Sequence, residues 1–285
     1  MLLILVPSQM DLRMKQFRIV VFICLLLISM NIRISFAEDE VLNNGQDITR
    51  PLTRFDVRYQ FQRLPSPADG NSNIATLRAD HPFTLTSDLK FTARFDMPFV
   101  VSTATGPDNL DGSTKVGFGD LLAMGLLIYK LSDRFACAAG AQFTFPTAST
   151  DEMGSGKYTV LPTLGVRMDL HEISRGSLAV LITRYNTDYA GNSDRSHISE
   201  LQFAPMVVIN LPQRWFVNLF PSTDIRYNLA NEKPGDKGRW FIPADFMVGK
   251  MLNKTTVASL EVSIPIIKDY NVYDFKMEAR VGFFF

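Results

Sequence analysis

The sequence predicts an all-β protein, folded as a transmembrane antiparallel up-and-down β-barrel of about twelve strands. Three observations lead to this prediction: strands with one apolar and one charged face, turns that alternate between long and short, and a chain that ends on three phenylalanines. Successive side chains of a strand point to opposite faces, so residues of one parity share one environment. In a membrane barrel the outward face meets lipid and the inward face meets a polar interior.

The alternation is clearest in residues 273–285. One parity is wholly apolar and comprises Tyr273, Phe275, Met277, Ala279, Val281, Phe283 and Phe285. The other parity carries four consecutive charges, at Asp274, Lys276, Glu278 and Arg280. Residues 55–62, 89–99 and 239–248 repeat the pattern. One such strand would also suit a soluble β-sandwich whose charged face meets water, but repetition in four segments favours the barrel.

A secretory signal peptide is expected over residues 1–37. Two basic residues, Lys15 and Arg18, precede a twelve-residue apolar run from Ile19 to Met30. Small residues then stand three and one positions before an expected cut after Ala37, as in cleavable signals. The run is short for a spanning helix, which needs about 20 apolar residues, so an uncleaved anchor is the weaker alternative.

The expected cut sets the domain boundaries. Met14 offers an alternative start to Met1. Residues 38–51 are expected to form a periplasmic N-terminal extension, and residues 52–285 are expected to form the outer-membrane barrel. That length suits one large β domain. We therefore expect export through the inner membrane and a final location in the outer membrane of a Gram-negative-type cell.

Composition narrows the partners. The chain has 29 basic and 29 acidic residues, and the signal peptide contains four of the basic and one of the acidic ones. The mature chain thus carries a small negative excess, which argues against a nucleic-acid partner because such a partner calls for a clustered positive patch. Cys137 is the one cysteine outside the signal peptide, so no disulfide is expected within the mature chain.

The spacing of turns gives the number of strands. Five long connections rich in Gly, Asn, Asp and Ser alternate with shorter ones, as in barrels with long outside loops and short periplasmic turns. Twelve strands place both termini in the periplasm, and ten or fourteen are the alternatives, because residues 73–86 alternate weakly and contain Pro82. The expected strands are 52–64, 73–86, 89–101, 116–130, 135–146, 157–170, 177–189, 197–211, 214–228, 238–250, 255–268 and 272–285.

The end of the chain resembles the signal that outer-membrane barrels present to their assembly machinery. An alternating final strand closes on a bare aromatic ring, and Tyr273, Phe283 and Phe285 are the residues assigned to this signal. Aromatic residues near other strand ends are candidates for the girdles that lie at headgroup level. The expected macromolecular partners are therefore outer-membrane lipid and the barrel assembly machinery.

Charged residues of the inward parity are the candidates for lining the lumen. Charges of both signs are interleaved, which suits either a salt-bridge network that braces a narrow barrel or a selectivity lining for a solute. Three apolar inward residues, Phe216, Phe220 and Phe241, either offer a path for aromatic rings or plug the barrel. The lumen candidates are Asp56, Arg58, Lys90, Arg94, Asp96, Asp120, Arg226, Arg239, Asp245, Lys276, Glu278 and Arg280.

The sequence offers little support for a catalytic site or a metal site. His197 and Ser199 share one face of a strand, but side chains two residues apart are roughly 7 Å from each other, too far for a direct hydrogen bond. The two other histidines, His81 and His171, fall near strand ends and lack ligand spacing. No phosphate-binding loop is present. The chain is therefore expected to be no enzyme and to use no cofactor or metal.

Three stretches, taken together, resemble an outer-membrane family associated with the meta pathway of phenol degradation, whose members are often labelled transporters. They are GFGD at 117–120, FTFPTAS at 143–149, and GSGKYTVLPTLG beginning at Gly154. Ala148 stands where the family has a glycine. The resemblance implies a β-barrel for uptake of aromatic or other small hydrophobic compounds, and it leaves Asp120 as either a loop anchor or a solute contact.

The sequence thus predicts an outer-membrane channel for passive uptake of a small hydrophobic or aromatic solute. Twelve strands enclose more room than the eight whose interior side chains fill, yet less than an aqueous porin, so a narrow lumen is expected. A structural barrel with a plugged lumen and a membrane-embedded hydrolase are the alternatives.

Overall fold

The computed structural model describes residues 43–285 except 67, 107–108 and 232–234. The expected signal peptide, both candidate start residues and the first part of the expected extension lie outside the described residues. Among the described residues, no helix is long and apolar enough to cross a membrane.

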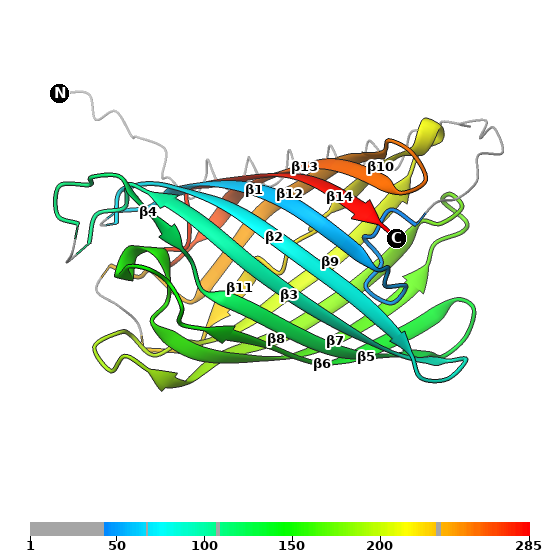
Figure 1. Ribbon diagram of the computed structural model, residues 1–285, viewed down its shortest axis with the longest axis horizontal. Coiled ribbons are helices and arrows are strands. Elements are labelled where there is room, and N and C mark those ends of the chain that lie inside the picture. The colour runs from blue at the N-terminus through cyan, green and yellow to red at the C-terminus, as the bar shows by residue number, and fades with distance from the viewer. Residues whose placement is uncertain (1–42, 67, 107–108, 232–234) are drawn as a thin grey trace, which may run out of the picture. The chain divides into compact units, whose positions relative to one another are not determined.

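The described chain is built from strands that follow one another around a barrel (Figure 1). Two single 3₁₀ turns, η1 (Asp151–Met153) and η2 (Pro212–Arg214), lie in connections. The strands are β1 (Arg54–Leu64), β2 (Gly70–Thr84), β3 (Leu89–Ser102), β4 (Lys115–Phe118), β5 (Leu121–Lys130), β6 (Phe135–Phe145), β7 (Lys157–Asp169), β8 (Leu178–Gly191), β9 (Ser199–Asn210), β10 (Trp215–Leu219), β11 (Ile225–Asn228), β12 (Trp240–Met251), β13 (Thr256–Lys268) and β14 (Phe275–Phe284).

The sheet closes on itself through antiparallel pairing of β1 with β14. Their register runs from Arg54 opposite Phe284 to Arg63 opposite Phe275. Both β4 and β5 pair with β3, and both β10 and β11 lie between β9 and β12, so each couple is one interrupted wall strand. Over the part of the chain that the structure describes, the wall therefore has twelve strands. The predicted fold class and strand count are confirmed.

The weakly alternating segment 73–86 does form a wall strand, β2. It pairs with β3 up to Thr84, whereas its pairing with β1 stops at Asp80. Pro82 thus lies where β2 has a partner on one side only. A proline is tolerated there because the missing N–H leaves no gap in a two-sided ladder.

The outer wall is apolar, as a lipid-facing surface requires. Large exposed side chains of one parity include Phe55, Val57 and Tyr59 on β1 and Phe95 and Phe99 on β3. Trp215 and Trp240 lie at the ends of β10 and β12, where aromatic rings suit the headgroup region. The alternation that predicted the barrel is therefore the division between its outside and its inside.

The interior differs between the two sides of the barrel. We call the end with the connections 85–88, 131–134, 170–177, 211–214 and 252–255 the short-turn end, and the opposite one the long-loop end. At the short-turn end the inner side chains of β8–β10 and β12–β14 form a buried apolar cluster, here the inner apolar cluster. It is made of Leu178, Val180, Ile182, Ala204, Met206, Val208, Phe216, Met247, Met251, Val257 and Phe284.

Phe216, one of the two phenylalanines of this cluster, is almost fully buried. It faces Gly249 on the neighbouring strand β12 in direct register. A Cβ atom at Gly249 would come within 2.2 Å of the Phe216 ring, so only glycine leaves room for the ring there. The phenylalanine predicted to point inward thus fills the interior and is held by a specific neighbour.

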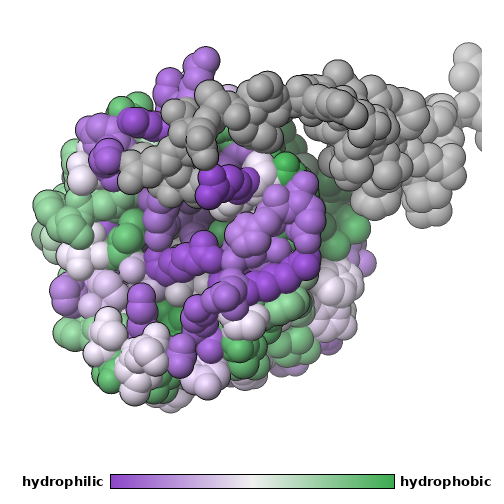
Figure 2. All heavy atoms as spheres, turned by 90° about the vertical axis from the view of Figure 1, so that its right-hand side faces the viewer, coloured by the Kyte–Doolittle hydropathy of each residue, from purple (hydrophilic) through white to green (hydrophobic). Residues whose placement is uncertain are grey.

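Residues 43–53 run along the inside of the short-turn end before β1 begins. Ile48 and Leu52 pack against the inner apolar cluster, and Gly45 lies against the Phe284 ring. Figure 2 views this end and shows hydrophilic side chains gathered across its middle, with hydrophobic ones toward the rim. The described part of the expected N-terminal extension therefore narrows the lumen.

A closed barrel should resist unfolding by detergent until it is heated. We expect the purified protein to run at different mobilities on a detergent gel before and after boiling, because hydrogen bonds between all twelve strands must break together. Identical mobility of both samples, with recovery in the soluble periplasmic fraction, would rule out this architecture in the cell.

The role of Phe285 in assembly stays a prediction, and the structure adds a second reason for it. The Phe285 N–H donates to the Thr53 carbonyl at 2.9 Å across the β1–β14 seam, while its ring is 84% exposed. Deleting Phe285 should lower the amount of assembled, heat-modifiable barrel in the membrane fraction. Replacement of Phe285 by Trp, which keeps both the backbone bond and an aromatic ring, is the control. Normal assembly of the deletion variant would contradict the prediction.

Candidate functional site

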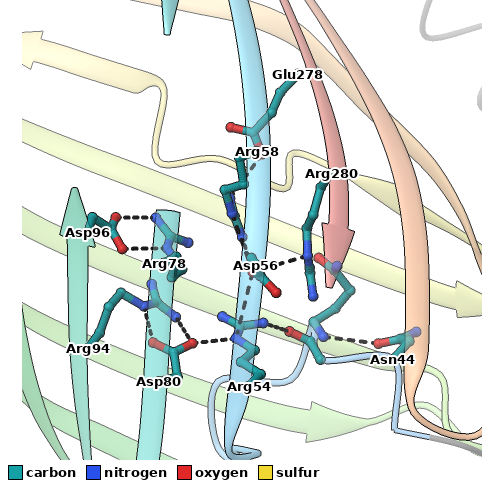
Figure 3. A network of polar contacts seen from close by, with 12 residues as sticks. Asn44, Arg54, Asp56, Arg58, Arg78, Asp80, Arg94, Asp96, Glu278 and Arg280 are labelled. Carbon is teal, nitrogen blue, oxygen red and sulfur yellow. Dashed lines mark hydrogen bonds and ion pairs between the residues drawn. The ribbon is translucent and has the colours of Figure 1, made fainter. Parts of the chain in front are cut away.

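The candidate site is the charged interior of the wall formed by β14, β1, β2 and β3 (Figure 3). In two rows across β1, β2 and β3, residues directly opposite one another carry opposite charges, and all of them have the inward parity. One row across the strands is Arg54, Asp80 and Arg94; the next is Asp56, Arg78 and Asp96. Each arginine in these rows therefore has a carboxylate beside it on a neighbouring strand.

The first row is centred on Asp80. Its carboxylate accepts hydrogen bonds from the Nε atoms of both Arg54 and Arg94, the latter at 2.6 Å. In the second row Arg78 binds Asp96 with two parallel bonds, of 2.7 Å from Nε and 2.6 Å from Nη2. Such two-pronged pairs are the strongest arrangement available to arginine and a carboxylate.

Asp56 joins the two sides of the closure seam. It is fully buried, with Arg58 Nη2 and Arg280 Nε each 3.2 Å from its Oδ2 atom. Arg58 also binds Glu278 at 2.9 Å. Gly282 stands directly opposite Asp56, and a Cβ there would come within 2.5 Å of the carboxylate. The seam is therefore sealed on its inner side by charge as well as by backbone pairing.

A second charged group lies around Lys276 of β14, with partners on β13 and in the segment between β10 and β11. Its ammonium is 2.6 Å from carboxylate oxygens of both Asp224 and Glu261. The Tyr273 hydroxyl donates to Asp224 at 3.0 Å, and Arg226 donates to the same carboxylate at 2.8 Å. This group contains more carboxylates than cations, because Asp245 also interacts electrostatically with Lys276.

Asp224 reaches this position because the wall strand breaks between β10 and β11. Residues 220–224 turn into the barrel, and the Ser222 hydroxyl there bonds Glu261 on β13 at 2.7 Å. Phe220 has a left-handed backbone, with φ of 51°, and the next residue, Pro221, has no N–H to give to a ladder. The sequence prediction of one continuous strand over 214–228 is wrong at this point.

The remaining lumen candidates lie apart from these two groups. Arg239 donates to the Asn228 carbonyl at 3.1 Å, and Lys90 is half-buried on the inward face of β3. Asp120 lies in the break between β4 and β5, where it accepts bonds from the Ser155 N–H at 2.6 Å and from the Ser155 hydroxyl at 2.8 Å. Asp120 thus ties down the connection between β6 and β7 at the long-loop end.

Tyr273 departs from the row of outward aromatic residues that the sequence suggested. It lies in the turn before β14 begins, and its ring is fully buried against Phe241, with ring centres 4.8 Å apart. Strict alternation holds only within a paired strand, so a turn residue is free to point inward. Val281, Phe283 and Phe285 do face outward.

The N-terminal segment contributes polar contacts that the sequence reading did not anticipate. Arg50 binds Asp169 at 2.7 Å, and Asp47 lies 3.8 Å from Arg167. Asn44 donates to Asn210 at 3.1 Å, across 166 residues of sequence. A pocket of about 210 Å³ remains between this segment and the wall near Leu178.

The histidine and serine considered as a catalytic pair bind different partners. His197 Nδ1 is 2.5 Å from Asp188, and the Ser199 hydroxyl is 3.0 Å from the Tyr185 hydroxyl. Among the described residues, no hydrogen bond joins His197 to Ser199. In the same part of the chain, no group of His, Cys, Asp and Glu is arranged to hold a metal ion.

The two-row pattern predicts a large cost for losing Asp80. Asp80→Asn keeps the size of the side chain but leaves Arg54 and Arg94 without their shared charge, so we expect a loss of about 3–5 kcal/mol in the free energy of unfolding. Urea unfolding in lipid vesicles, followed by tryptophan fluorescence, measures this loss. Glu172→Gln is the control, because its pair with Arg134 is 3.0 Å long but exposed. Equal unfolding midpoints for the two variants would refute the proposed bracing.

Comparisons with known proteins agree with this architecture. No curated protein shows significant sequence similarity to the chain. An outer-membrane channel from Pseudomonas putida F1 superposes with a TM-score of 0.64 at 15% identity, covering 86% of this chain and all of that one. At this identity the match shows a shared fold.

Two more distant structures superpose less well. The outer-membrane phospholipase A from Escherichia coli has a TM-score of 0.45 at 10% identity over 82% of this chain and 92% of its own. The toluene transporter TbuX from Ralstonia pickettii has a TM-score of 0.43 at 9% identity over 82% and 90%. Residues 62–264 match the family described as "Putative MetA-pathway of phenol degradation", and because this match spans most of the barrel, the chain belongs to that family.

Proposed function

We propose that the protein is an outer-membrane channel for passive uptake of small hydrophobic or aromatic compounds. The observation that carries this proposal is the division of the barrel interior into a charged zone and the inner apolar cluster. The charged rows come from β1, β2 and β3, and most of the inner apolar cluster comes from β8, β9, β10 and β12, so a solute in the lumen has charges on one side and apolar side chains on the other. Membership of a family associated with phenol degradation supports an aromatic solute.

The charged zone suits a selective channel better than a general pore. The rows on β1, β2 and β3 present paired charges, which hold their side chains in place and narrow the lumen without giving it one dominant sign. The inner apolar cluster is buried, so an aromatic ring that moved in among its side chains would leave water, which is favourable for apolar surface. Both features favour a compound that is small and partly apolar.

A structural barrel with a plugged lumen is the second candidate. It is favoured by residues 43–53, whose Ile48 and Leu52 pack on the inner apolar cluster and whose Arg50 is bound to the wall. A hydrolase is the least favoured, because His197 and Ser199 are engaged with separate partners. Export by a cleaved signal and entry through the assembly machinery belong to the proposal as well.

Uptake into liposomes distinguishes the first two candidates. Purified protein should speed the entry of phenols and aromatic acids several-fold over protein-free vesicles, and should speed the entry of sugars less, because the narrow and partly apolar lumen disfavours strongly hydrated solutes. The control is the same protein after boiling, which has lost the barrel. If no compound enters faster than through protein-free vesicles, the channel proposal fails and the plugged barrel becomes the better account.

A further inference from the structure

Arg184 has an unusual position on β8. The inward row of this strand runs through Leu178, Val180 and Ile182, all buried in the inner apolar cluster, and then reaches Arg184. Across the pairing with β9, Arg184 faces Gln202, while Ile182 faces Ala204. Arg184 therefore stands at the boundary where the apolar zone of the interior meets the charged zone.

The guanidinium of Arg184 makes few and long hydrogen bonds. Its Nη1 atom is 3.4 Å from the Gln142 amide oxygen and 3.4 Å from the Thr223 hydroxyl, both at the limit of a hydrogen bond. Its buried Nε has no partner. A guanidinium carries five N–H donors, so most of its donating capacity is unused. Leaving such a charged group without partners in a barrel interior is costly unless a ligand accepts its remaining hydrogen bonds.

Seven other inward arginines differ from Arg184 in one respect. Each of them has a carboxylate within 4.0 Å, whereas among the described residues none lies that close to Arg184. The paired arginines are Arg54, Arg58, Arg78, Arg94, Arg167, Arg226 and Arg280.

The charges that act on Arg184 come mostly from cations. Arg94 and Arg78 repel its charge, and Asp96 attracts it, but Asp96 is already held by both prongs of Arg78. The local charge is therefore positive, and the lining nearest to Arg184 on its own side is neutral: Gln142, Gln202 and Thr223. An anion entering this space meets attraction and free donors without displacing a protein carboxylate.

We propose that Arg184 anchors a binding site for a small organic carboxylate. The carboxylate accepts hydrogen bonds from the guanidinium and the Gln142 side chain, and the apolar part of the solute lies toward Ile182 and Met206. Arginine suits this role because its planar fork matches a carboxylate. This inference rests on the proposed channel function, since the solute must reach the interior, and it narrows the solute class to organic acids with an aromatic or aliphatic body.

Channel recordings in planar bilayers test the site with benzoate as the probe. Benzoate should reduce the chloride current through the wild-type protein, whereas benzyl alcohol, which has the same ring and no charge, should not. In Arg184→Gln the benzoate concentration for half-block should rise about tenfold, the effect of losing one charge-assisted hydrogen bond. Arg184→Lys keeps the charge without the fork and should fall between the two.

Arg134→Gln is the matched control, because Arg134 lies in an exposed turn paired with Glu172. Benzoate should block Arg134→Gln at the same concentration as it blocks the wild type. The heat-dependent gel shift shows that each variant is folded. Equal block by benzoate and benzyl alcohol, or equal half-block concentrations in wild type and Arg184→Gln, overturns the carboxylate site.

Calorimetry separates failure of this site from failure of the channel. If no variant conducts, the channel proposal fails, and benzoate is then titrated into the folded wild-type and Arg184→Gln proteins in detergent. Weaker binding by Arg184→Gln, by about tenfold, supports the site even in a barrel that does not conduct. Equal binding, or heat that matches protein-free micelles, overturns it.

Discussion

The structure depends on one constraint: in lipid, every backbone N–H and C=O of the wall must find a partner within the protein. Closure of β1 on β14 meets that constraint, because it removes the last two free strand edges. Closure also fixes which parity faces inward, since a shift of one residue at the seam would exchange lipid-facing and interior side chains. The apolar outside and the charged inside are therefore consequences of one register.

Charges placed inside such a wall need partners, and the register supplies them. Inward residues alternate in sign both across β1, β2 and β3 and along each of these strands. Opposite charges are therefore neighbours in both directions on the inner face. A buried pair is weak evidence for net stability, because removing two charges from water costs several kcal/mol each. What the rows do provide is specificity: a slipped register would set arginine beside arginine. The direct opposition of Arg58 and Arg280 shows the need, and Asp56 between them meets it.

The alternation of apolar and polar residues predicted the fold. Where the alternation is weak or broken, the prediction from sequence was incomplete. The twelve strands follow from alternation and turn composition, which are local properties of the chain. Arg78 and Asp80 were not among the lumen candidates because β2 alternates weakly, with Asn73 and His81 on its outward face. Their role becomes visible only through pairing with β1 and β3. The prediction of one strand over 214–228 overlooked Pro221, and the direction of the break there depends on contacts with Glu261 and Lys276, which are distant in sequence.

The N-terminal segment shows the same limit, and it contacts both apolar and charged parts of the interior. Its residues alternate between the two kinds of partner: Asp47 and Arg50 approach the charged pair Arg167 and Asp169, while Ile48 packs on the inner apolar cluster. No local pattern predicts such contacts, because they arise only when the closed wall surrounds the segment. Once the segment is in place, it narrows the lumen beside the inner apolar cluster, and the charged rows of β1, β2 and β3 lie on the other side of the interior. A solute with one charged and one apolar end matches that contrast, because each part can then occupy the zone that costs it least to enter.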